Sequence, residues 1–148
     1  MYSIVLRQLD GINNGVQTTH GVCEYVRKHW NDPDLQRWLN HDKTLVVLNG
    51  GTYKDMEEIK TLLFESQIPF ETFEEEDLGD LTTSICLLAD ERVWDQKVYP
   101  KFEIFRELTN REHGYEVPDE TLVMSFEKIV GGHQNGIKKQ LLNNMRTI

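Results

Sequence analysis

The sequence has few cysteines and no long apolar run. Cys23 and Cys86 are its only cysteines, and both lie in apolar segments that are far apart in the chain. This predicts two reduced, buried thiols in a cytoplasmic protein rather than a disulfide. No apolar stretch approaches the roughly 20 residues of a membrane span. The N-terminal region lacks the basic segment and the long apolar core of a signal peptide. We therefore expect no membrane association.

Positive charge is also scarce. The chain has 16 Lys and Arg against 25 Asp and Glu, a net charge of -9. Such a protein is not expected to bind polyanions non-specifically, because phosphate binding depends on clustered cations. A tRNA or other nucleic-acid partner would need a local basic patch. Two candidates exist, Arg27-Lys28-His29 and a C-terminal group of Lys138, Lys139 and Arg146, and an ordinary solvated surface is the alternative for both.

Motifs for metals, cofactors and common nucleophiles are absent. The five histidines are scattered, without the cysteine or histidine spacings of a zinc site. The sequence contains no serine nucleophile elbow and no dinucleotide-binding fingerprint. We therefore expect neither a metal nor a cofactor.

The sequence does contain alternating strand and helix patterns. A length of 148 residues suits one domain, and a hydrophobic fraction of 39% can form a core. Strands are expected at 4–6, 44–48, 68–73 and 83–88, and helices at about 15–30 and 54–65. The second strand is apolar throughout, which predicts a central position, and Pro69 places the third strand at an edge. This order predicts an α/β core at residues 1–90, a single layered domain with a mostly parallel four-stranded sheet flanked by helices.

Residues 91–148 form an extension beyond this core. Trp94, Val98, Phe102 and Phe105 have the spacing of one helix face, with Pro100 near its start. Leu122 to Phe126 fits either a strand or the first turn of another helix. We expect the extension to pack on the same domain, where it could cover a sheet edge, form a lid or build a homodimer contact.

Several short motifs follow one another along residues 1–90 in an order found in one enzyme family. They are Ile4-Val5-Leu6-Arg7 at the end of the first strand, a glycine-rich loop from Gly11, Gln17-x-x-His20, Leu35-x-x-Trp38, Leu62-Leu63 and Asp77-x-Gly79. In their order and spacing they resemble the archaeal and eukaryotic type of peptidyl-tRNA hydrolase, called type 2. The resemblance implies a compact α/β fold with its site at the mouth of the glycine loop and the Asp77 turn.

The resemblance also implies a reaction, the hydrolysis of the ester that joins a peptide to the terminal ribose of tRNA. Such a site needs a base or water-positioning group and donors for the developing oxyanion. By resemblance, Asp77 is the acid/base or water orienter, and His20 and Gln17 are helix residues close to it. Further residues are expected to contact the substrate: Arg7, Asn13, Asn14, Gly79, Thr82 and Thr83.

The sequence departs from the family in its charges. Related enzymes carry lysines in the glycine loop, and the position of an important one is occupied here by Asn13, in a shorter loop. Arg7 could supply a cation, but its planar head does not replace an ammonium group without rearrangement. Acidic residues at 74–76 and Asp80 flank Asp77 and would repel a phosphate. The alternative is therefore an inactive member of the same fold, a pseudoenzyme that binds a small nucleotide-like ligand, another small molecule or a protein partner.

A second resemblance lies near the C-terminus. The segment from Gly131 to Gly136, G-G-H-Q-N-G, is similar to the G-G-H-N-G segment of the bacterial type of peptidyl-tRNA hydrolase, with Gln134 as an extra residue. By that resemblance Asn135 would help to bind the substrate end. The two enzyme types have unrelated folds, and Gly-Gly and Asn-Gly are ordinary turn signals, so a simple turn is the alternative.

Overall fold

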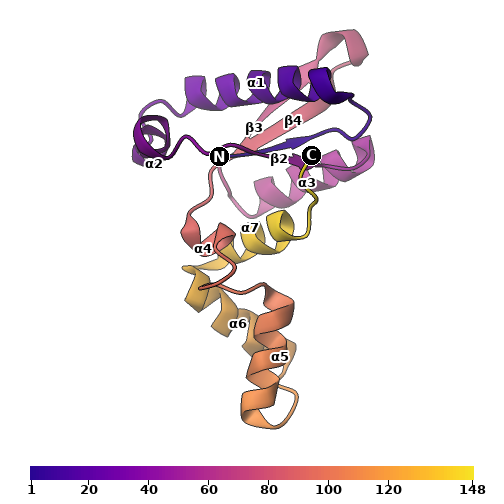
Figure 1. The fold of residues 1–148 in the computed structure, drawn as a ribbon. Helices are drawn as coiled ribbons and strands as arrows, with labels where there is room; N and C mark the ends of the chain where they lie inside the picture. The colour runs from indigo at the N-terminus through magenta and orange to yellow at the C-terminus, as the bar shows by residue number, and fades with distance from the viewer. The chain divides into compact units, whose positions relative to one another are not determined.

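The computed structural model describes all residues from 1 to 148, and the chain divides into two compact units (Figure 1). The first unit comprises residues 1–88 together with 145–148, and the second comprises residues 89–144. None of the helices combines the length and the apolar character that crossing a membrane requires.

The first unit follows the expected order of strands and helices. Its elements are β1 (Tyr2–Val5), α1 (Gly11–Lys28), α2 (Pro33–Arg37), a π-helical turn (Trp38–Asp42), β2 (Val46–Asn49), α3 (Tyr53–Glu65), β3 (Glu71–Glu75), a 3-10 turn (Glu76–Leu78) and β4 (Leu81–Leu87). The prediction of an α/β fold with four strands is confirmed.

The four strands form a mixed sheet in the order β2-β1-β4-β3. Only β1 and β2 are parallel, whereas β4 is antiparallel to both of its neighbours. The prediction of a mostly parallel sheet was therefore wrong. Only a short turn separates β3 from β4, and a connection of that length allows only antiparallel pairing. Because β4 also pairs with β1, two of the three strand pairs in the sheet are antiparallel.

The position of β2 also differs from the prediction. Its apolar run indicated a central strand, but β2 lies at an edge of the sheet and β1 and β4 are central. The C-terminal residues cover this edge, since the Asn49 amide donates to the Arg146 carbonyl (2.9 Å) and the Ile148 amide donates to the Val47 carbonyl (3.0 Å). A sequence pattern reports which faces of a strand are covered but not how many strands lie beside it. The predicted edge position of the third strand is confirmed.

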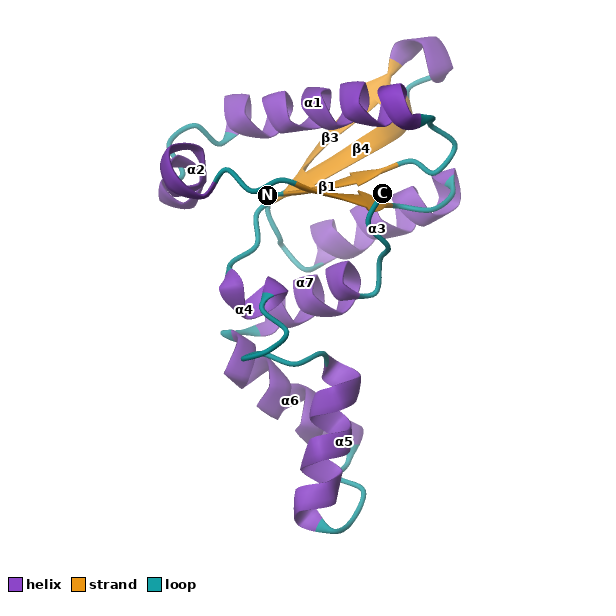
Figure 2. Cartoon of the chain, viewed as in Figure 1, coloured by secondary structure: helices purple, strands orange, loops and turns teal.

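Helix α1 covers one face of the sheet and α3 covers the other (Figure 2). On the α3 face, Gly50 lies against Met56 and Ile4, and both of these side chains are fully buried. Helix α3 begins with a capping box, in which the Thr52 hydroxyl accepts from the Asp55 amide and the Asp55 carboxylate accepts from the Thr52 amide.

Helix α1 begins four residues earlier than predicted, so the expected glycine loop is its first turn. The Asp10 carboxylate caps the helix by accepting from the backbone amide of Asn13 (3.3 Å) and from its side-chain amide (2.8 Å). Asp is a favoured N-cap residue, and the cap outweighs the weak helix propensity of two glycines. The prediction that Cys23 is buried was wrong as well, because α1 turns Gln17, Thr18, Gly21 and Tyr25 toward the sheet.

The second unit consists of four helices, α4 (Glu91–Trp94), α5 (Phe102–His113), α6 (Asp119–Val130) and α7 (His133–Asn143). Its apolar core contains Phe102, Leu122, Phe126 and Val130. Leu122 to Phe126 is thus helical rather than a strand. Trp94 and Val98 do not share a helix face with Phe102, because α4 ends at Trp94 and α5 begins only at Phe102.

Candidate functional site

A cleft of about 780 Å³ opens in the first unit where the start of α1 meets the turn between β3 and β4. This volume lies in the range typical of small-molecule sites, roughly 300–1,000 Å³. The lining residues come from the loop after β1, from α1, from the start of α3, and from the β3–β4 turn with the adjoining strand ends: Leu6, Gln8, Leu9, Asn13, Val16, Gln17, Tyr53, Glu75, Asp77, Leu78 and Leu81.

Three residues predicted from the sequence line this cleft together, namely Asn13, Gln17 and Asp77. Asp77 lies on the 3-10 turn, is exposed to solvent, and its carboxylate makes no hydrogen bond or ion pair. Gly79 ends the turn at a φ of 72°, a left-handed conformation that glycine adopts without strain. The turn therefore presents a carboxylate that is free to accept a proton or to orient a water molecule.

Gln17 is the best-fixed polar residue of the cleft. Its side chain is only 6% exposed, and its Nε2 donates to Glu75 Oε2 (2.8 Å). Its Oε1 accepts from the Thr83 hydroxyl (2.7 Å). Both ends of the amide are thus engaged by the protein, and Gln17 holds Glu75 at the cleft wall.

A break in the strand register explains the role of Thr83. Phe73 lies opposite Ser84, but Glu74 lies opposite Thr82, so that Thr83 has no opposite residue in β3. Such a bulge redirects a side chain, and here the Thr83 hydroxyl reaches Gln17 on the α1 face.

Thr82 lies on the other face of the sheet. Its hydroxyl accepts from Lys60 Nζ (2.9 Å) and donates to Glu57 Oε1 (3.2 Å), and both partners belong to α3. The structure therefore does not bring Thr82 to the cleft, although its neighbour Thr83 supports the cleft through Gln17.

Four other predicted site residues are not among those that line the cleft: Arg7, Asn14, His20 and Gly79. The imidazole of His20 stacks on the ring of Phe73 at 4.3 Å. Arg7 is exposed and its guanidinium has no partner. Asn14 is half-buried, and its buried Oδ1 has no hydrogen-bond partner.

Three polar lining residues were not predicted from the sequence, Gln8, Tyr53 and Glu75, and of these only Glu75 is an acid. It was treated only as part of an acidic turn. The alternation of β3 contains the signal, because Phe73 and Glu75 are two residues apart and contact His20 and Gln17 of α1. The apolar walls were also missed, since Leu9, Val16, Leu78 and Leu81 look like ordinary core residues in the sequence.

The cleft is lined by two carboxylates and by no lysine or arginine. The first predicted basic patch does not compensate for this. Arg27 pairs with Glu24 (2.7 Å), and Lys28 and His29 both contact the Glu71 carboxylate, at 2.6 and 2.9 Å. Acidic neighbours thus neutralise much of the positive charge that this segment could offer to a phosphate backbone.

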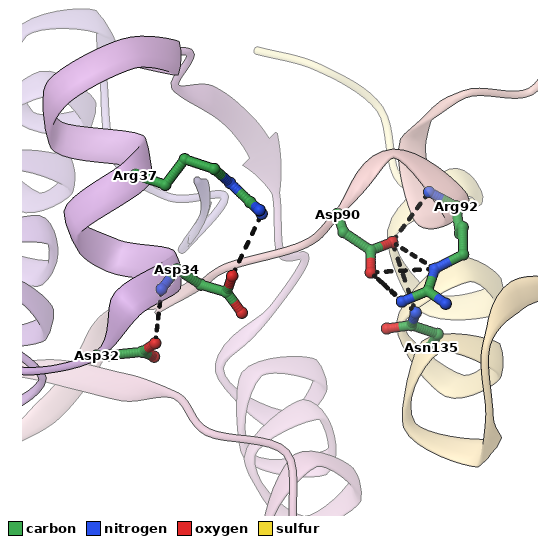
Figure 3. A network of polar contacts seen from close by, with 6 residues as sticks. All are labelled: Asp32, Asp34, Arg37, Asp90, Arg92 and Asn135. Carbon is green, nitrogen blue, oxygen red and sulfur yellow. Dashed lines mark hydrogen bonds and ion pairs between the residues drawn. The ribbon is translucent and has the colours of Figure 1, made fainter.

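The second unit uses its candidate residues for internal contacts. Asn135 Nδ2 donates to the Asp90 carboxylate (3.2 Å) and to the Val130 carbonyl (2.8 Å), and Arg92 contacts the same carboxylate (2.7 Å; Figure 3). Burial raises the pKa of Asp90, but the hydrogen bonds from Arg92 and Asn135 more than offset this and lower it. The amide of Asn135 therefore connects helices, which favours the turn interpretation of the segment from Gly131.

Lys139, a member of the second basic patch, is only 1% exposed. Its Nζ donates to the Val93 carbonyl at the end of α4 (2.9 Å), and Asn143 donates to the same oxygen (3.2 Å). Burial lowers the pKa of Lys139. This side chain consequently contributes no exposed cation to the patch.

Comparison with known proteins gives no match: no family model, no curated protein and no solved structure is significantly similar to this chain. No group of three or more His, Cys, Asp or Glu residues is arranged to hold a metal ion. The cleft itself is therefore the basis for assigning a function.

Proposed function

We propose that the cleft hydrolyses an ester, as type 2 peptidyl-tRNA hydrolases do, and that Asp77 activates the attacking water. The observation that carries this proposal is the convergence of Asn13, Gln17 and Asp77 on one cleft. Asn13 and Gln17 lie one helical turn apart on α1, so the informative feature is that Asp77, on the distant β3–β4 turn, lines the same cleft. An exposed carboxylate without partners meets the first requirement for a general base, which is access to a water molecule.

In this mechanism water adds to the ester carbonyl carbon while Asp77 accepts a proton from it. The bond between the carbonyl carbon and the ribose oxygen then breaks, and the proton passes to that oxygen. The products are a carboxylic acid and a free ribose hydroxyl. Asn13 can stabilise the oxyanion, because only one of its two side-chain N–H groups is needed for the bond to Asp10.

The second candidate function is ligand binding without chemistry. It is favoured by the charges, since the cleft has no cation for a tRNA phosphate and the Arg27 patch is paired internally. In this case the fold retains the cleft and binds a small molecule or a protein partner through it.

Hydrolysis of a purified N-blocked aminoacyl-tRNA at low and moderate salt tests the first candidate. Asp77→Asn should reduce turnover by about 10²-fold or more, as expected for loss of a general base. Asp80→Asn is the matched control, because Asp80 is exposed on the same turn, does not line the cleft, and has a φ of 59° that Asn tolerates. Full turnover in Asp77→Asn refutes the assignment. If the wild-type protein neither hydrolyses the substrate nor binds tRNA at low salt, the hydrolase is refuted and ligand binding without chemistry remains as the function.

A further inference from the structure

The walls of the cleft combine two kinds of surface. Leu6, Leu9, Val16, Leu78 and Leu81 make much of the lining apolar. Glu75 and Asp77 add two carboxylates on the β3–β4 side. An apolar pocket with a few placed polar groups is the usual form of a small-molecule site, and its polar groups determine which ligands are accepted.

Glu75 is held in position for such a ligand. Its Oε2 accepts from Gln17, and Gln17 is anchored in turn by the bulged Thr83. Glu75 Oε1 has no partner, and neither oxygen of Asp77 has one. A carboxylate only accepts hydrogen bonds, so these unused oxygens require a donor from the ligand or from water.

The charges around the cleft select the sign of the ligand. Glu76 and Asp80 lie on the same turn as Asp77, and neither forms an ion pair. The cation nearest in the chain, Arg7, is adjacent to Leu6 and Gln8 but does not line the cleft. Clustered charge of one sign in a cleft with apolar walls raises the local concentration of oppositely charged ligands.

We infer that the cleft binds a small organic cation, with an ammonium group at Glu75 and Asp77 and an apolar body against the leucine-lined wall. An amino-acid derivative with a free α-ammonium group has this chemistry. The inference uses the cleft of the proposed function but not its reaction, because an ammonium group at Asp77 occupies the carboxylate that hydrolysis assigns to water, and an N-blocked substrate has no such group.

The test compares two ligands that differ in one charge. L-leucinamide carries a free α-amino group, which is almost fully cationic at about pH 6, and N-acetyl-L-leucinamide is neutral. Each is titrated into the full-length protein at low salt, and the backbone amide shifts of Asn13, Leu78 and Leu81 are followed by NMR. We expect the cation to bind at least about tenfold more tightly, with a preference that declines as salt is added.

Glu75→Gln should remove most of that preference, because it removes a fixed charge and retains the shape of the side chain. Glu76→Gln is the matched control, since Glu76 is exposed and does not line the cleft. Three results overturn the inference: no detectable binding of L-leucinamide at millimolar concentration, equal affinity for the two ligands, or equal effects of the two substitutions.

The outcome is separable from that of the proposed hydrolysis, because neither amide contains the ester. Selective binding of L-leucinamide without ester turnover supports the ligand class and refutes the hydrolase. Ester turnover that is lost in Asp77→Asn, together with equal affinity for the two amides, supports the hydrolase and refutes the ligand class.

Discussion

The close contact between α1 and β4 predicts the effect of one substitution. Gly21 faces the central strand, and a Cβ atom added there would lie 2.5 Å from Ser84 Oγ and 2.8 Å from Cys86 Sγ. Both residues are fully buried. Because β4 is paired on both sides, its backbone cannot move away easily. Gly21→Ala should therefore destabilise the protein through overpacking.

The magnitude follows from two opposing effects. Replacing glycine by alanine inside a helix favours the helix by about 1 kcal/mol. Forcing an additional methyl group into a packed core costs roughly 1–3 kcal/mol. Gly15→Ala isolates the first effect, since Gly15 lies in the same helix and a Cβ atom there has no other atom within 4 Å. The free energy of unfolding of Gly21→Ala should thus be roughly 1–3 kcal/mol below that of Gly15→Ala.

Urea unfolding followed by circular dichroism measures this difference. In thermal unfolding, each kcal/mol of this difference should lower the melting temperature of Gly21→Ala relative to Gly15→Ala by about 2–4 °C, as is typical for a protein of this size. Adding Ser84→Ala should recover part of the loss, because it removes the nearer atom and also a buried hydroxyl that has no partner. If Gly21→Ala is as stable as Gly15→Ala, the packing of α1 against β4 is not as described.

Two further predictions concern buried groups. Burial lowers the pKa of Lys139 from its ordinary value of 10.5, so the ammonium costs folding free energy at neutral pH and the cost disappears as pH rises toward that value. Lys139→Met should therefore raise the free energy of unfolding at pH 7, and Asn143 should still donate to the Val93 carbonyl in this variant. Urea unfolding at about pH 9.5 should show a smaller gain in stability. An equal gain at the two pH values contradicts the reasoning. Cys23 is exposed, whereas burial raises the pKa of Cys86 to about 11, so a thiol reagent should label only Cys23 in the native protein and both after denaturation. Early labelling that persists in Cys23→Ser would show that Cys86 is accessible.

The local parts of the fold could be predicted from the sequence, and the long-range parts could not. Alternating helix and strand periods predicted four strands in the correct order along the chain, since each period depends only on neighbouring residues. The direction and order of the strands depend on which segments pair after the chain turns, and no local pattern records that β4 inserts beside β1. The cover of β2 by Arg146 and Ile148 is equally non-local, because these residues bond to Asn49 and Val47 near the other end of the chain.

The same distinction applies to the cleft. Asp77 and Gln17 belong to short motifs and could be selected from them. The start of α1 was misplaced because two glycines suggested a loop, whereas the side chain of Asp10, just before them, caps a helix. The apparent loop asparagine, Asn13, is bonded to that cap. The N-cap at Asp10, which accepts two hydrogen bonds from Asn13, thus favours helix over loop at this point.

The bulge at Thr83 determines what Gln17 can do in the cleft. The two ends of its amide are bonded to Glu75 and to Thr83, and rotating the amide toward a ligand would break both bonds. Leaving such buried groups without partners costs roughly 1–3 kcal/mol each, more than one new hydrogen bond to a ligand returns. Gln17 therefore acts in our proposal as a positioning residue: it is fixed by Thr83 of the central strand β4 and in turn holds Glu75 in place. Direct contact with a ligand falls to Glu75, Asp77 and Asn13, whose remaining acceptors and donors face no such competition.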